Sequence, residues 1–210
     1  MSVFLLPQTH ALRRGLVAVA LCVTTSPALA GSMNSVSTLR HDPDHNGREI
    51  RQTLEAAGWQ HEVVDRDGLY TELATVMVLE ITDSATALDD RFAQAPRLAA
   101  NFEHMVLSGT ARIYQREGAL LFVSIQLRPE GGEQVTCILG SPPDPETLTL
   151  MAQHGRSVVD VPTPRLVTRV TEEDGAGLRS MRLWSRLTHE PAPTPLTDLF
   201  YMERLTPEGR

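Results

Sequence analysis

Hydrophobic and polar positions alternate most regularly in the middle of the chain. Apolar residues recur at every second position in two runs, which are Leu121, Val123, Ile125 and Leu127, and then Val135, Cys137 and Leu139. Successive side chains of a strand point to opposite faces, so each run belongs to one buried face of a sheet. Residues 110–116, 119–127 and 134–139 are therefore predicted as three successive strands of a meander, joined by turns at 117–118 and 129–132.

Helical spacing governs the first half of the chain. Residues 46–57 carry Ile50, Leu54 and Ala57 on one helical face, and Gly58 ends that helix. Residues 59–64 read as a short strand, whereas the apolar run 75–81 fits either a buried strand or the end of a helix. A second helix is predicted to begin near Ser84, to be interrupted at Pro96 and to continue to about His104. Residues 146–154 fit a short helix.

Two further strands, 166–171 and 178–188, predict a C-terminal hairpin. With Asp174 and Gly175 at the centre of its turn, Leu166 lies opposite Leu183 and Thr168 lies opposite Met181, which gives one apolar face. The other face then collects Val167 and five candidate ligand-binding residues: Arg165, Arg169, Arg182, Trp184 and Arg186.

Helices first and antiparallel strands later indicate an α+β fold, with N-terminal helices and a mainly antiparallel sheet made of the meander and the C-terminal hairpin. We expect three segments: an export signal at 1–30, a single α+β domain at 31–190, and a Pro-rich spacer with a C-terminal tail at 191–210. The apolar tail around residues 198–202 is expected either to fold back or to dock elsewhere.

The first thirty residues have the order of an export signal. Arg13 and Arg14 precede an apolar run at 15–23, and an A-x-A site at 28–30 predicts cleavage after Ala30. General secretion and twin-arginine export both remain open. No later apolar stretch is long enough to span a membrane, so the mature chain is expected to be a soluble periplasmic or secreted protein without a transmembrane segment.

Composition narrows the classes of function. Hydrophobic residues make up 41% and charged residues 21% of the 210 residues, which is ordinary globular composition. The 19 basic residues are all arginine. A lysine-free chain cannot be a P-loop NTPase, a PLP enzyme, a protein kinase or an S-x-x-K serine enzyme. Without the two arginines of the signal, 17 arginines and 26 acidic residues leave a formal net charge of −9, so nucleic acid is not the expected partner.

The candidate catalytic and metal-binding residues are few. Removal of the signal leaves Cys137 as the one cysteine, and its strand parity favours a buried, inert thiol over a nucleophile paired with His104 or His154. The segment 61–65 resembles H-E-x-x-H with Asp in the last position, but it is predicted as a strand, where the two end residues do not converge.

No cofactor is expected from the sequence, and the alternative is a Ca²⁺ site at Asp42, Asp44 and Asn46, which lie in a D-x-D-x-N-G sequence. Thr53 occupies the position where a calcium loop carries its bidentate carboxylate, so the same residues can instead cap the following helix. His41 and His45 are alternative ligands for a transition metal.

The arginine face carries the leading hypothesis for function. Guanidinium groups pair with carboxylate or phosphate, and Trp184 offers a stacking surface. The partner would be an anionic small molecule, a lipid headgroup, a glycan or an acidic envelope protein. The sequence thus favours a binding or accessory module over an enzyme. The alternatives are a solvated face, a hydrolase built from scattered His and acidic residues, and a structural subunit that docks through its tail.

Overall fold

The structure of this chain is a computed structural model that describes Met33, Val36 and residues 47–62, 68–82, 85–129, 131–154, 158–160, 165–173 and 179–205. The predicted export signal lies outside these residues, as do Asp42, Asp44 and Asn46 of the candidate Ca²⁺ site and the pair His41 and His45.

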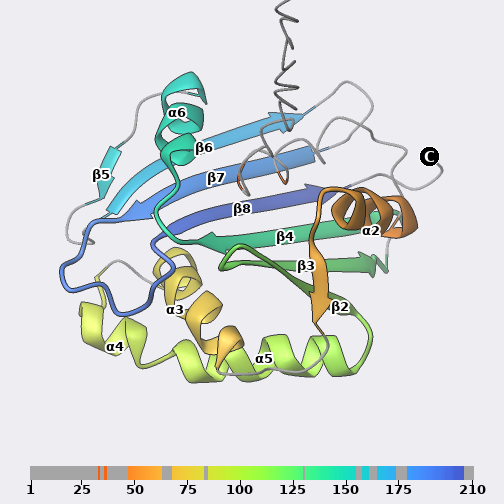
Figure 1. Ribbon diagram of the computed structural model, residues 1–210, viewed down its shortest axis with the longest axis horizontal. Helices are drawn as coiled ribbons and strands as arrows, with labels where there is room; N and C mark the ends of the chain where they lie inside the picture. The colour runs from red at the N-terminus through yellow and green to blue at the C-terminus, as the bar shows by residue number, and fades with distance from the viewer. Residues whose placement is uncertain are drawn as a thin grey trace, which may run out of the picture.

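Helices lie on both sides of one eight-stranded sheet (Figure 1). The helices are α2 (Gly47–Ala56), α3 (Leu69–Ile81), α4 (Leu88–Phe92), α5 (Ala95–Leu107) and α6 (Pro145–His154). The strands are β1 (Gln60–Glu62), β2 (Ala111–Arg116), β3 (Ala119–Leu127), β4 (Glu133–Ser141), β5 (Val158–Asp160), β6 (Arg165–Glu173), β7 (Arg179–Leu187) and β8 (Asp198–Leu205). Their order across the sheet is β1-β2-β3-β4-β8-β7-β6-β5, and all neighbours pair antiparallel. The predicted α+β class is confirmed.

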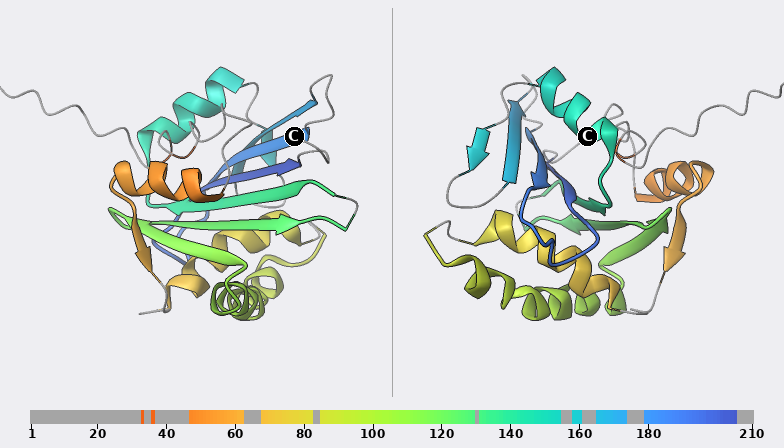
Figure 2. Two further views of the ribbon diagram at one scale, coloured as in Figure 1. Left: turned by 90° about the vertical axis from the view of Figure 1, so that its right-hand side faces the viewer. Right: turned by 60° about the vertical axis from the view of Figure 1, so that its left-hand side comes forward.

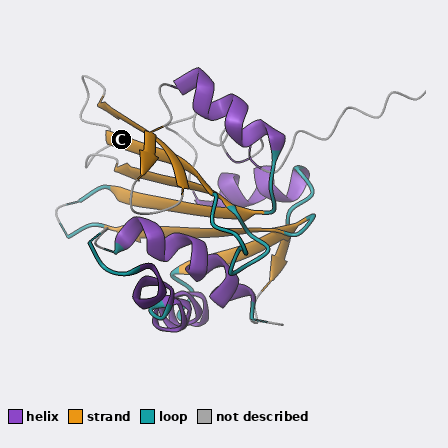
Figure 3. Ribbon diagram, turned by 90° about the vertical axis from the view of Figure 1, so that its left-hand side faces the viewer, coloured by secondary structure: helices purple, strands orange, loops and turns teal. Residues whose placement is uncertain are grey.

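The sheet separates two hydrophobic cores. In the first core, on one face, α3 and α5 pack on strand residues such as Phe122 and Ile138, and α4 leads into the start of α5 (Figure 2). In the second core, on the other face, Ile50 and Leu54 of α2 and Met151 of α6 belong to a cluster that includes Trp184 and Phe200. Figure 3 shows the same three layers from the side, with helices above and below the strands. Because both faces are covered, neighbouring side chains of a central strand are both buried.

The ambiguous segment 75–81 is the second half of helix α3. Eight residues of α3 are buried, and the helix packs between α5 and the sheet. An element covered on two sides has no polar stripe, which is why hydrophobic spacing did not separate helix from strand. The helix ends at Ile81, and the backbone of the capping residue Thr82 is extended.

The predicted meander of β2, β3 and β4 is confirmed. Leu121 pairs with Leu139, Val123 with Cys137 and Ile125 with Val135. One member of the run departs from the prediction, because Leu127 is 82% exposed at the end of β3. It is the last residue of β3 and pairs with Glu133 beside the β3–β4 turn.

The predicted register of the C-terminal hairpin is wrong by three residues. Thr168 pairs with Trp184 and not with Met181, and Leu166 pairs with Arg186 and not with Leu183. The prediction assumed that one face of the hairpin was open to water. Trp184 and Leu183 point to opposite faces and are both buried, so that assumption fails.

The C-terminal tail is a central strand of the sheet. β8 lies between β4 and β7 and pairs with both along its length, so the tail folds back onto the domain. Gly140 of β4 makes close packing possible here, since a Cβ atom at this position would lie 2.9 Å from Leu73 Cδ1 of α3 and 3.0 Å from Leu196 Cδ1.

Candidate functional site

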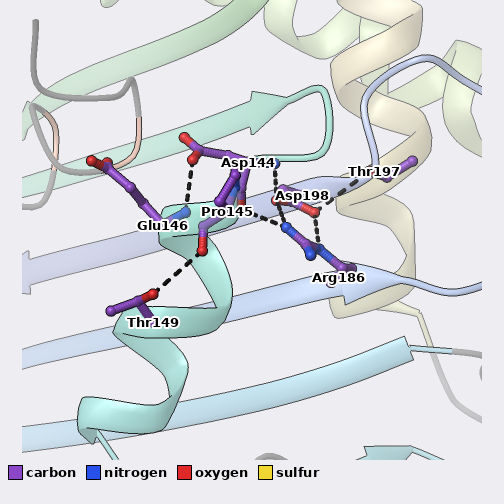
Figure 4. Close-up of polar contacts among 7 residues, drawn as sticks. All are labelled: Asp144, Pro145, Glu146, Thr149, Arg186, Thr197 and Asp198. Atoms are coloured by element: carbon purple, nitrogen blue, oxygen red, sulfur yellow. Dashed lines mark hydrogen bonds and ion pairs between the residues drawn. The ribbon is translucent and has the colours of Figure 1, made fainter.

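Arg186 anchors helix α6 to the centre of the sheet (Figure 4). Its Nε donates to Asp198 Oδ1 at 2.6 Å and its Nη2 donates to Asp198 Oδ2 at 2.5 Å. The same Nη2 also donates to the carbonyl of Asp144 at 2.5 Å, and the backbone N–H of Asp144 donates to Asp198 Oδ2 at 2.8 Å. Asp198 is completely buried. The guanidinium is therefore held by partners within the fold.

Arg182 and Trp184 lie on the same face as Arg186, beneath α6. Trp184 is fully buried, and the ring of His154 stacks on it at 4.8 Å with 9° between the ring planes. The Arg182 guanidinium lies 5.4 Å from the Trp184 ring and donates to Glu172 Oε1 at 2.6 Å. Arg182 is buried, so this cation–π contact belongs to the second core.

Arg165 and Arg169 lie on the opposite face, towards α3. Arg165 forms an ion pair with Glu80 and donates to the carbonyl of Leu79 at 2.8 Å. Burial raises the pKa of the Glu80 carboxyl, against the opposing charges of Arg165 and Arg169 and a hydrogen bond from Ser185. These contacts fasten the end of α3 to β6 and β7.

The predicted arginine–tryptophan face therefore does not form. Its members divide between the two faces of the sheet, and Arg165, Arg182 and Arg186 pair with Glu80, Glu172 and Asp198. Glu80 lies 85 residues before Arg165 and Asp198 lies 12 residues after Arg186, both outside the hairpin, so the tertiary fold brings these two pairs together.

The remaining predicted candidates do not assemble into a site. Cys137 is buried, as expected, and burial raises the pKa of its thiol to about 12. His61 and Glu62 belong to strand β1, as expected. His104 is exposed on α5, far in sequence from the stacked His154 of α6. Within the described ranges, no group of three or more His, Cys, Asp or Glu residues could hold a metal ion.

A groove between α2 and the strands β2 and β3 is a candidate binding site. We call it the α2 groove; its volume is about 380 Å³, which falls within the range of small-molecule sites. Its side-chain lining comprises Ile50, Arg51, Arg112, Tyr114, Val123 and Ile125, and residues 109–111 complete the lining. Arg112 and Tyr114 come from alternate positions of β2, whereas Val123 and Ile125 come from β3, so the antiparallel register brings cationic and apolar groups together.

Two cations flank a phenol in this groove. Arg112 is exposed, and no described residue forms an ion pair with it. Arg51 contacts Glu55 through a long 3.9 Å pair in which both side chains are about half exposed, a contact that contributes little free energy. Burial raises the pKa of Tyr114, and the charges of Arg112 and Arg51 oppose this rise while Glu55 adds to it. The Tyr114 hydroxyl thus remains a donor near two guanidinium groups.

Sequence reasoning missed the α2 groove because its two arginines are separated by about sixty positions. Arg112 alternates with apolar residues in a predicted strand, which placed it on a sheet face. Nothing in the sequence located α2 over that face.

No protein-family model matches this sequence, and no curated protein or solved structure gives a significant match. The proposals below rest on the geometry of this chain. None of the described helices combines the length and the apolar character that crossing a membrane requires.

Proposed function

We propose that this protein is a binding module for a small amphipathic anion, which it holds in the α2 groove. The observation that carries the proposal is the exposed guanidinium of Arg112, which lacks an acidic partner among the described residues and lies at the rim of an apolar groove. A carboxylate or phosphate would supply that partner, with Arg51 as a second cation.

The lining also defines the rest of the ligand. Ile50, Val123 and Ile125 offer apolar contact, so an anion with an aliphatic chain gains more than a free inorganic ion. Both arginines are solvent-accessible, which favours a headgroup that lies at the rim while the chain enters the groove. A fatty carboxylate and an alkyl phosphate share this chemistry.

The test is calorimetric titration with octanoate and with octyl phosphate. We expect saturable binding that weakens as salt is raised, because screening reduces the attraction of exposed charges. Arg112→Gln should lose a charge-assisted hydrogen bond of about 1.5–3 kcal/mol, which corresponds to about 10- to 150-fold weaker binding. Arg179→Gln is the matched control, since Arg179 is 65% exposed on the side chain and does not line the groove. Equal binding by both variants and the wild type would contradict the proposal.

We also propose that this protein is exported, because residues 1–30 have the order of an export signal. N-terminal sequencing of the exported protein should begin at Gly31. A product that retains Met1 inside the cell would contradict export.

None of the contacts described above supports the hydrolase alternative. The α2 groove contains neither His104 nor His154. The tail-docking alternative is weakened because β8 already has strand neighbours on both sides.

A further inference from the structure

We propose a second ligand site on the opposite face of the sheet, which takes an unbranched aliphatic chain with an uncharged head. It is a groove of about 210 Å³ between α3, α5 and the sheet, named the α5 groove here. Its helical wall consists of Met77, Ile81, Leu98, Phe102 and Met105. This site is independent of the α2 groove, although both use β3: residues 123 and 125 line one groove, and residues 122, 124 and 126 line the other.

The shape and lining of the α5 groove select a thin, flexible ligand. Its volume lies below the usual range for drug-sized molecules, which excludes bulky ring systems. The rings of Phe102 and Phe122 lie 4.7 Å apart and form an aromatic wall. Methionine side chains adapt to irregular apolar surfaces, so Met77 and Met105 can follow an alkyl chain. Ile81 is 55% exposed, and this places an apolar side chain at the entrance.

Neutral polar groups supply the recognition of the head. Ser124, Gln126, Thr136 and Tyr201 line the sheet side of the groove, and no charged side chain of the described chain lines it. Gln126 Nε2 donates to Ser124 Oγ at 3.2 Å, and Ser124 Oγ donates to the Thr110 carbonyl at 3.3 Å. The amide oxygen of Gln126 can therefore accept a hydrogen bond from an alcohol or an amide.

A nearby carboxylate disfavours an anionic head. The Tyr201 hydroxyl donates to Glu203 Oε2 at 3.3 Å, and Gln134 Nε2 donates to Glu203 Oε1 at 2.6 Å. Burial and the charge of Glu203 raise the pKa of Tyr201 to about 12, so the phenol keeps its proton at neutral pH. A second anion beside Glu203 would be repelled, whereas a hydroxyl head can donate to Gln126 and accept from water. The two grooves thus differ in the head that they accept.

The test uses ¹³C-methyl methionine NMR on the full chain, titrated with n-octanol and, separately, with octanoate. Octanol should shift the Met77 and Met105 methyl signals saturably, while Met151 and Met202 in the other core stay unchanged. Ile81→Trp should close the entrance and weaken octanol binding at least tenfold. Leu148→Trp is the control, because Leu148 is a 42% exposed residue on α6, away from the groove.

Three results would overturn the proposal. The first is the absence of a saturable shift at Met77 and Met105. The second is an equal shift at Met151 and Met202, which would mean non-specific partitioning. The third is octanoate binding at Met77 and Met105 as tightly as octanol, which would contradict the assignment of an uncharged head. Unchanged Met151 and Met202 signals in Ile81→Trp establish that this variant is folded. None of these results tests the proposed anion site, which lies in the α2 groove.

Discussion

The guanidinium of Arg186 on β7 forms a bidentate pair with the fully buried carboxylate of Asp198 on β8 (Figure 4). The pair joins neighbouring central strands, and it also holds the backbone of Asp144 at the start of α6. An arginine that the sequence placed on an exposed binding face is therefore part of the framework of the domain.

Replacement of Arg186 by Gln should destabilise the protein strongly. The substitution leaves the carboxylate of Asp198 buried without its counter-charge, a change that typically costs about 3–5 kcal/mol. Arg179→Gln on the same strand breaks only an exposed pair with Glu173 and should change the free energy of unfolding by less than about 1 kcal/mol. Urea denaturation of both variants measures the two free energies of unfolding. Similar stabilities would show that the Arg186–Asp198 pair is not structural.

Gly140→Ala should also destabilise the domain, because the new methyl group would meet Leu73 and Leu196 at 3.0 Å or less. Overpacking of this kind costs about 1–3 kcal/mol. Leu73→Ala alone removes buried volume and should cost about 2–5 kcal/mol. In the double variant the added methyl occupies part of the vacated space, so the loss in thermal or urea stability should be less than the sum of the single losses. Strict additivity would contradict the close approach of α3 and β4.

The buried Glu80 should give stability a characteristic dependence on pH. Burial raises the pKa of Glu80 above its ordinary value of 4.5, despite the opposing charges of Arg165 and Arg169, so the folded protein binds this proton more tightly than the unfolded chain. The contribution of Glu80 to stability therefore falls as pH rises from about 4.5 through the raised pKa. The wild type should lose stability relative to Glu80→Gln over this window. A relative gain with rising pH would mean that the Arg165 pair outweighs burial.

Cys137 should react slowly with thiol reagents in the folded protein. The side chain is 1% exposed, and its pKa of about 12 leaves almost no thiolate at neutral pH. Labelling should accelerate when urea unfolds the chain. In the full-length protein, the variant Cys22→Ser leaves Cys137 as the one thiol that can be labelled. Rapid labelling of this variant in its folded state would revive the nucleophile hypothesis.

Local patterns predicted many elements of the fold, but they did not predict the strands β5 and β8 or the register of the C-terminal hairpin. Alternation of apolar residues was sufficient for the β2–β3–β4 meander, because pairs such as Val123 and Cys137 lie close in sequence and share one parity. The hairpin register failed because β7 is covered on both faces. Arg165 of β6 and Arg186 of β7 pair with Glu80 of α3 and Asp198 of β8, which no local pattern connects to the hairpin.

The prediction of the site was limited in the same way, because it too depends on tertiary contacts. The expectation of an arginine-based anion site survives as a proposal, but the arginines are Arg51 and Arg112. Their convergence depends on the placement of α2 over β2, which sequence spacing does not encode.

Fluorine NMR of the protein labelled with 3-fluorotyrosine tests the central claim most directly. The chain has three tyrosines. Tyr114 lines the α2 groove, Tyr201 lines the α5 groove and Tyr70 is buried in the first core, so each gives a separate signal. Octanoate should shift the Tyr114 resonance saturably, with Tyr70 and Tyr201 unchanged, and Arg112→Gln should suppress that shift. An unmoved Tyr114 resonance at saturating octanoate, or a shift that survives Arg112→Gln undiminished, would contradict the anion-binding role of the α2 groove.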